Sequence, residues 1–361
     1  MSSHAPPDDL DPRLGDVANL ISGRPFEPHP LIRGGHAQTV AGWAWPRPWR
    51  LKALRRAHTM DEERLFEVEP GVRLLARCRW REDRASSPTL VLVHGLGGSN
   101  ASAYVMGTAE LAYEAGMNVV RLNQRNCGRT EHLTPTLYHS GLSGDLRGVV
   151  TELLERDRLP AVLVAGFSMG GNLALKMAGE LGNEGWEGLL GVCAISPPVD
   201  LSETARHLEH PSNRLYQWRF VSGLKRMMVR KQELYPRLYE LQNLERIHTV
   251  RQFDELYTAP HGGFSGADDY YARSSALPLL PKIRLPTLIL HARDDPLVPP
   301  APFLRPEASE IPNVLAVTPH HGGHVGFVSG EGKAGRFWAE AIVAKFCHAL
   351  SSPLLSSPLG S

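Results

Sequence analysis

Six short apolar runs recur along the chain, separated by turns and by longer polar stretches. They cover residues 89–93, 119–122, 161–165, 189–195, 287–290 and 313–317. Strands that are apolar on both faces are typical of parallel sheets covered by helices on both sides. Segments with helical spacing follow several of the runs, at 101–115, 145–155, 169–181 and 335–350. Because strand and helix alternate, right-handed crossovers are expected, and the chain is predicted to form a three-layer α/β domain with a mostly parallel sheet.

Three other segments flank or interrupt this alternation. Two runs of alternating polarity meet at Pro70-Gly71 and predict a β-hairpin. Between the fourth and fifth runs, apolar residues at helical spacing predict a helical insertion over the carboxyl edge of the sheet, where ligands bind in such folds. The tryptophans Trp43, Trp45 and Trp49 predict an N-terminal arm that packs on the main domain. The expected organisation is therefore an arm at 1–56, a main α/β domain at 57–200 and 281–350, a helical lid insertion at 201–280 and a disordered tail at 351–361.

The charge balance and the cysteines argue against several classes of protein. The 361 residues carry a formal net charge of +1, which gives no long-range attraction to nucleic acid or to an anionic membrane. Cys78, Cys127, Cys193 and Cys347 are far apart and form no CxxC pair, which fits a reducing compartment, and Cys193 reads as a buried thiol. No secretory signal opens the chain, and no apolar run approaches the ~20 residues that span a bilayer. A soluble, cytoplasmic protein without an integral membrane segment is expected.

The strongest chemical signal is the sequence Gly166-Phe167-Ser168-Met169-Gly170. It matches G-x-S-x-G and lies directly after a buried strand and before a helix, which is the setting this motif requires. A serine on such a sharp turn has strained backbone and crowded neighbours, so the flanking positions must be nearly free of side chain. We interpret Ser168 as a nucleophile. The alternative is a glycine-rich turn with a purely structural role.

A serine hydroxyl needs a base, and the base needs an orienting acid. In this kind of fold the chain order is Ser, then Asp or Glu, then His. The fifth apolar run is followed by Asp294 and Asp295, and the sixth by His320, His321 and His324. Asp295 precedes a rigid Pro-Leu-Val-Pro turn and is the favoured acid, with Asp294 as the alternative. His324 follows two glycines, which allow close approach to Ser168, and is the favoured base. A metal site of these histidines and aspartates is a weaker alternative, since no HEXXH motif is present.

The loop after the first apolar run supplies a candidate oxyanion hole. It reads His94-Gly95-Leu96-Gly97-Gly98-Ser99. The fold supplies one backbone N–H from this loop and one from the residue after the nucleophile, so Leu96 and Met169 are the expected donors. A phosphate-binding loop is the rival interpretation, but the Gly-Lys-Ser/Thr sequence of a Walker motif is absent. In the insertion, the basic and apolar stretch 225–231 is either a solvated helix face or a contact for a phosphate or acyl-chain substrate.

With these motifs in place, the sequence resembles the YheT-like family of esterases within the α/β-hydrolases. The resemblance runs from about residue 26 to 346 and is carried by several stretches beyond the serine motif. They are Pro30 to Thr39, His94 to Ser99, Arg125 to Gly128, Tyr138 to Gly141, Ala267 to Tyr271 and His321 to Phe327. Asn126 departs from the family pattern, where glycine is more usual, and could alter the pocket wall.

The resemblance implies an α/β-hydrolase fold with a helical lid insertion, and it places Ser168, Asp295 and His324 on the family's charge-relay positions. It implies a serine esterase that cleaves short- to medium-chain carboxylic esters, needs no cofactor or metal, and has a small-molecule ester as its partner. An acyltransferase or thioesterase using the same three residues is the alternative, and a non-catalytic interaction module is a remote one. The sequence leaves the oligomeric state open.

Overall fold

The computed structural model describes residues 11–45, 47, 61–305, 307, 310–311, 313–332 and 335–355. Eight strands form one sheet in the order β1-β2-β4-β3-β5-β6-β7-β8. The strands are β1 (Glu62–Glu69), β2 (Val72–Arg79), β3 (Thr89–Val93), β4 (Asn118–Leu122), β5 (Val162–Phe167), β6 (Leu189–Ile195), β7 (Thr287–Leu290) and β8 (Val314–Val317). The pairs from β4 to β8 are parallel, whereas β1 and β2 form the expected antiparallel hairpin. The predicted α/β fold with a mostly parallel sheet is confirmed, and each apolar run lies within two residues of a strand.

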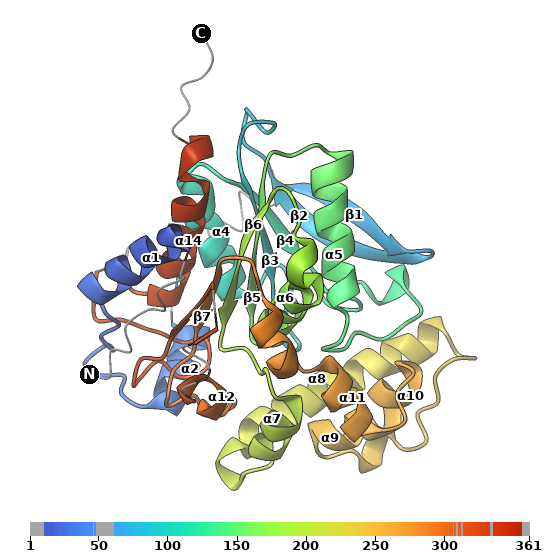
Figure 1. Cartoon of the computed structure of the whole chain (residues 1–361). Coiled ribbons are helices and arrows are strands. Elements are labelled where there is room, and N and C mark those ends of the chain that lie inside the picture. The colour runs from blue at the N-terminus through green and yellow to red at the C-terminus, as the bar shows by residue number, and fades with distance from the viewer. Residues whose placement is uncertain are drawn as a thin grey trace.

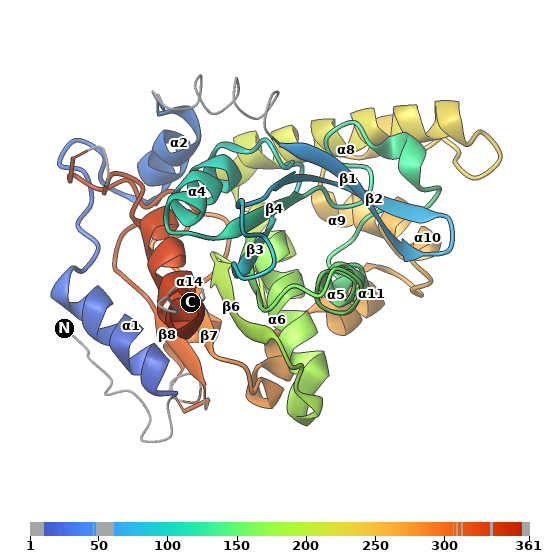
Figure 2. The same cartoon turned by 90° about the horizontal axis from the view of Figure 1, so that it is seen from above.

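Side chains that alternate along each strand divide the core into two layers. On β3, Leu90 and Leu92 face one side and Val91 and Val93 face the other, and all four are fully buried. Helices α1 (Pro12–Gly23), α4 (Ala103–Glu114) and α14 (Trp338–Leu355) cover the first side, and α5 (Ser143–Thr151) and α6 (Met169–Leu181) cover the second. Figure 2 shows the two groups of helices on opposite sides of the sheet. Strands buried on both faces explain why the apolar runs are continuous.

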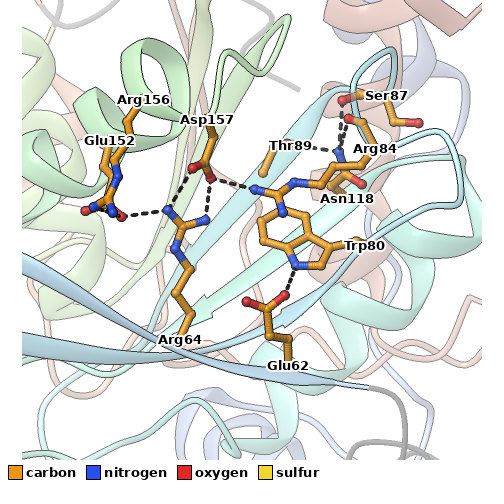
Figure 3. Close-up of polar contacts among 10 residues, drawn as sticks. All are labelled: Glu62, Arg64, Trp80, Arg84, Ser87, Thr89, Asn118, Glu152, Arg156 and Asp157. Atoms are coloured by element: carbon orange, nitrogen blue, oxygen red, sulfur yellow. Dashed lines mark hydrogen bonds and ion pairs between the residues drawn. The ribbon is translucent and has the colours of Figure 1, made fainter.

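Ion pairs attach the β1–β2 hairpin to the turn that continues α5 (Figure 3). The Arg64 guanidinium on β1 donates to Glu152 at 2.6 Å and also binds the Asp157 carboxylate. Arg84 donates to the same Asp157 at 2.6 Å. Burial disfavours the charge on Arg64, but the bonds to the two carboxylates outweigh burial and raise its pKa. The edge of the sheet is therefore held by charge as well as by apolar packing.

The N-terminal arm forms two helices, α1 and α2 (Gly35–Ala44). The arm packs on the main domain through Leu14, Val17 and Ile21, which are buried against α14. The expected role of the tryptophans is wrong for Trp43, whose surface is 63% exposed, and Trp49 lies outside the described residues. Aliphatic side chains of α1 therefore make the contact together with Phe26, whose ring packs against Phe327 and Trp338.

The C-terminal helix is longer than predicted. It continues to Leu355, so residues 351–355 are helical and not part of a disordered tail. Ser351 is fully buried, and its hydroxyl donates to the Cys347 carbonyl at 2.7 Å. The Cys347 carbonyl takes the place of water as the acceptor for the serine hydroxyl, so a buried serine is tolerated within the helix. The rest of the predicted tail, 356–361, lies outside the described residues.

The segment at 201–280, called the insertion below, folds as helices beyond the carboxyl ends of the central strands (Figure 1). Its helices are α7 (Leu201–Leu208), α8 (Arg214–Leu234), α9 (Val250–Phe253), α10 (Ala259–His261) and α11 (Ala267–Ser274), with a π-helical turn at Asp254–Thr258. A separate apolar cluster joins the insertion to the main domain, with Met169 and Leu297 on one side and Met228 and Phe253 on the other. A short helix, α12 (Ala301–Leu304), follows β7. Within the described residues, no helix has the length and apolar character needed to cross a bilayer.

Candidate active site

Ser168 lies at the sharp turn between β5 and α6. Its backbone has φ 52° and ψ −122°, a strained conformation for a residue with a side chain. The neighbouring glycines leave no room for a larger residue. A Cβ on Gly166 would lie 2.1 Å from the Gly170 carbonyl oxygen, and one on Gly170 would lie 2.5 Å from the Val93 carbonyl oxygen. The glycine spacing in the sequence is therefore a packing requirement of this turn.

The three side chains expected to act together lie within hydrogen-bonding reach of one another. His324 Nε2 is 2.9 Å from Ser168 Oγ, and His324 Nδ1 is 2.9 Å from Asp295 Oδ2. The other carboxylate oxygen of Asp295 accepts the backbone N–H groups of Leu297 at 2.8 Å and Val298 at 3.0 Å. An acid, an imidazole and a hydroxyl from three distant segments thus form one continuous hydrogen-bonded chain.

Asp295 is buried, yet it is held in its charged form. Burial alone would raise its pKa, but the neighbouring His324 ring and the backbone N–H donors outweigh burial and lower it. An ionised Asp295 accepts a hydrogen bond from Nδ1, which leaves Nε2 of His324 free to receive a proton from Ser168. The electrostatics therefore match the arrangement that a general base needs.

The other candidates have different partners. Asp294 accepts the Gly323 N–H at 2.9 Å and contacts His321 Nδ1 at 3.1 Å. Its carboxylate therefore stabilises the loop at 320–327, called the histidine loop below. His320 and His321 are exposed. The structure therefore brings Asp295 and His324 to Ser168, and it does not bring the alternative residues there. Within the described residues, no cluster of three potential metal-ligating side chains occurs.

Two hydrogen bonds that hold the histidine loop were not predicted from the sequence. The His324 N–H donates to Thr39 Oγ1 of α2 at 2.8 Å, and the Val325 N–H donates to Ser196 Oγ at 3.1 Å. Helix α2 lies so close to the loop that a Cβ on Gly42 would come within 2.6 Å of Gly326 Cα. The signal in the sequence was the spacing of Gly35 and Gly42, two helical turns apart on one face of α2.

The expected oxyanion loop approaches the nucleophile directly. A Cβ on Gly95 would lie 2.9 Å from Ser168 Cβ, and Leu96 and Met169 both line the pocket around Ser168. Met169 is the first residue of α6, so its N–H has no acceptor within the helix. The His94 ring stabilises this loop through two hydrogen bonds. Its Nε2 accepts the Gln124 N–H at 3.2 Å, so its Nδ1 carries the proton and donates to the Gly95 carbonyl at 2.8 Å.

Ser168 opens into a pocket of about 750 Å³, its mouth included. Much of the pocket wall comes from the insertion and is apolar. The apolar lining residues include Leu201, Ala205, Leu208, Phe220, Leu224 and Val250 of the insertion, and Leu96, Met169, Pro198, Leu297 and Val298 of the main domain. A second part of the wall is polar and includes Asp254 and Tyr271. An apolar chamber next to an activated hydroxyl suits a small, largely apolar substrate.

Comparisons with known proteins show the family of this chain. The sequence model of the α/β-hydrolase fold family matches residues 88–331, which include Ser168, Asp295 and His324. This chain belongs to the α/β-hydrolase family. It is 34% identical over 272 residues to YheT of Escherichia coli (strain K12), an esterase by name, covering 73% of this chain and 78% of that protein. It is 31% identical over 269 residues to the monoacylglycerol lipase of Saccharomyces cerevisiae, covering 72% of this chain and 59% of the lipase.

Solved structures agree on the fold of this α/β-hydrolase. The crystal structure of 2,6-dihydroxy-pseudo-oxynicotine hydrolase matches with a TM-score of 0.55 at 18% identity, covering 88% of this chain and 79% of that one. At this identity the likeness concerns the fold alone. The predicted relationship to the YheT-like branch of the α/β-hydrolases is confirmed by sequence similarity, and the names of the relatives support hydrolase activity.

Proposed function

We propose that this α/β-hydrolase cleaves carboxylic esters through an acyl-enzyme formed on Ser168. The observation that carries the proposal is the unbroken chain from Asp295 through His324 to Ser168, with 2.9 Å at each link of the imidazole. His324 takes the Ser168 proton as Oγ attacks the ester carbonyl. Ionised Asp295 keeps the imidazole oriented and stabilises its positive charge.

The oxyanion of the tetrahedral intermediate is bound by the backbone N–H groups of Leu96 and Met169. Both residues line the pocket beside Ser168, and Met169 begins α6, whose N-terminus favours negative charge. His324 then gives its proton to the departing alcohol. A water molecule deprotonated by His324 attacks the acyl-enzyme, the acyl–Oγ bond breaks as His324 returns its proton to Ser168, and the acid is released. No step requires a metal or a cofactor.

The pocket favours a small-molecule ester with a short- to medium-chain acyl group, because its apolar part is walled by the insertion, which acts as a lid over Ser168. The names of the relatives, an esterase and a monoacylglycerol lipase, support carboxylic esters as the substrate class. We place the protein in the cytoplasm, since its four cysteines are free and buried.

Replacing the nucleophile tests the proposal. Ser168→Ala should lower kcat/KM for p-nitrophenyl acetate, butyrate and octanoate by at least about 10³-fold, because the acyl-enzyme cannot form. Its unfolding midpoint should remain close to that of the parent protein. A fluorophosphonate probe should label the parent protein and not the variant.

The matched control is Ser202→Ala, a serine on α7 that does not line the pocket. It should keep both turnover and labelling. Undiminished ester cleavage by Ser168→Ala would remove Ser168 from the mechanism.

A further inference from the structure

The polar part of the pocket wall contains a buried carboxylate. Asp254 is 8% exposed and begins the π-helical turn Asp254–Thr258 of the insertion. Both of these residues line the pocket that opens at Ser168. The Asp254 carboxylate accepts the Thr258 hydroxyl at 2.7 Å on one oxygen and the Tyr271 hydroxyl at 2.8 Å on the other. Wide π-helical turns are uncommon and often mark functional sites.

Two stretches that carry the family resemblance, Tyr138 to Gly141 and Ala267 to Tyr271, meet beside this carboxylate. Neither takes part in the ester-cleavage steps. The Tyr270 hydroxyl accepts the Ser140 N–H at 2.9 Å, and Tyr270 packs edge-on against His139 at 5.8 Å between ring centroids. Tyr270 and Tyr271 are themselves in contact, with ring centroids 5.2 Å apart. The side chains around Asp254 thus form an aromatic and polar end of the pocket.

The Asp254 carboxylate is not paired with a cation in the described part of the chain. Among the described residues, no lysine, arginine or histidine forms an ion pair with it. The charge of Arg251 lowers the pKa of Asp254, but its guanidinium forms its ion pair with the Asp268 carboxylate at 2.8 Å and lies 5.8 Å from the centre of the Tyr271 ring. A carboxylate that is buried without a counter-ion is unfavourable, and two neutral hydroxyl donors offset only part of that cost.

The neighbouring titratable groups are neutral. Burial lowers the pKa of His139 to about 4, so its imidazole carries no charge at neutral pH. Burial also raises the pKa values of Tyr270 and Tyr271, which keeps both phenols protonated. The pKa of Asp254 is raised by burial to about 6, so the carboxylate is mostly ionised at pH 7.5. The Asp254 carboxylate is therefore an ionised group in the lining of this end of the pocket.

We propose that Asp254 is the centre of a substrate subsite that binds a positively charged group, an ammonium or quaternary ammonium carried by the ester. The Asp254 carboxylate supplies the counter-charge, and the rings of Tyr270 and Tyr271 supply aromatic surface of the kind that binds such cations. The inference deepens the proposed ester hydrolysis and rests on it. It predicts that the enzyme discriminates by charge as well as by chain length.

A pair of esters of equal shape isolates the charge. Butyrylcholine and 3,3-dimethylbutyl butyrate differ by the replacement of a quaternary nitrogen with carbon, and both present the same carbonyl to Ser168. The parent protein should cleave the cationic ester with the higher kcat/KM. In Asp254→Asn, the ratio of the two kcat/KM values should fall by about tenfold or more, because the counter-charge is lost. Cleavage of the neutral ester should persist.

The matched control is Glu203→Gln, which removes one negative charge from α7 at a side chain paired with Arg206 and outside the pocket lining. It should leave the ratio unchanged. An equal fall in both kcat/KM values in Asp254→Asn would overturn the proposal and assign Asp254 a structural role. A larger loss for a neutral hydroxylated ester than for butyrylcholine would also overturn it.

Two further measurements test the subsite independently. The first needs no variant, and the second needs no turnover. Between pH 8 and pH 5, the parent protein's cationic-to-neutral ratio should fall with a midpoint near pH 6 as Asp254 gains a proton. The charged and titratable groups that interact with Asp254, namely Arg251, Tyr138, Tyr270 and Tyr271, do not titrate in that range, because the pKa of each is raised. The effect of the shared catalytic residues cancels in the ratio. A ratio that stays flat over this range contradicts the proposal.

The second measurement is calorimetric titration of Ser168→Ala with tetramethylammonium. Binding should be present in this variant and should weaken by about tenfold or more when Asp254→Asn is added. Failure of ester cleavage with intact binding would refute only the proposed function, whereas cleavage of the neutral ester without any such binding would refute only the subsite.

Discussion

Asp294 and Asp295 are adjacent in sequence, yet their carboxylates serve different segments. Asp295 is buried and faces His324 Nδ1, whereas Asp294 is turned toward Gly323 and the exposed His321. The chain turns at this point, with the Asp295 N–H donating to the Ala292 carbonyl at 3.2 Å, so the two adjacent side chains reach different partners. The backbone N–H groups of Leu297 and Val298, which both bind Asp295, select it for the role of acid.

Amide substitutions should separate the two aspartates. Asp295→Asn should lower kcat for ester hydrolysis by about 10³- to 10⁴-fold, because a neutral amide can hold the wrong imidazole tautomer and cannot stabilise the charged ring. Asp294→Asn should cost about tenfold or less, since its amide oxygen can still accept the Gly323 N–H. Steady-state kinetics on p-nitrophenyl butyrate measures both effects. Similar losses in the two variants would contradict the assigned division of roles.

Helix α2 shows how an element outside the sheet determines the position of a catalytic group. Thr39 accepts the His324 N–H, and the backbone of α2 lies directly against the histidine loop at Gly35 and Gly42. A Cβ on Gly35 would lie 1.7 Å from the Asp294 carbonyl oxygen, closer than any real contact. The arm is therefore part of the support of the active site rather than an accessory segment.

Two glycine-to-alanine substitutions in the arm test this arrangement. Gly42→Ala should lower kcat by about tenfold or more and cost about 1–3 kcal/mol of unfolding free energy, because the new methyl group forces α2 away from Gly326. Gly15→Ala on α1 meets no atom within 4 Å and should preserve kcat while adding about 0.5–1 kcal/mol of stability. Urea unfolding and steady-state kinetics on both proteins supply the comparison. Full activity in Gly42→Ala would show that α2 does not position His324.

At the scale of the whole molecule, buried histidines link the stability of the fold to pH. Burial lowers the pKa of His94 and that of His139 to about 4, below the ordinary value of 6.5. Between pH 6.5 and pH 4 the unfolded chain therefore binds more protons than the folded one, and stability falls as the pH falls. His94 holds the loop beside Ser168, so acid should loosen the active site and the fold together.

The acid dependence can be measured directly. The unfolding free energy should be constant near pH 7.5 and should fall below pH 6.5 at up to about 1.4 kcal/mol per pH unit for each buried histidine, or about 3 kcal/mol for His94 by pH 4. His94→Asn should give a shallower acid limb in urea unfolding. The control is His348→Asn, which removes an exposed imidazole on α14 and should keep the parent slope. An unchanged slope in His94→Asn would contradict this account.

The sequence by itself determined the architecture and singled out Ser168, the residue that we propose as the nucleophile. Continuous apolar runs can be stable only in a sheet covered on both faces, and the glycines around Ser168 leave one local backbone solution. These constraints act between residues close in sequence, so the composition and spacing of residues reveal them. The order of serine, acid and histidine along the chain follows from the same fold, so the candidate site could be narrowed to a few residues before any coordinates were known.

Only the tertiary structure decided between Asp294 and Asp295, brought α2 against the histidine loop, and placed Asp254 in the wall of the pocket. Each of these features depends on segments tens to hundreds of residues apart, such as Thr39 with His324 or Asp254 with Ser168. Local propensity and periodicity do not encode such distances. Packing of the insertion and the arm onto the sheet sets them, because close packing leaves few arrangements in which the buried polar groups also find hydrogen-bond partners.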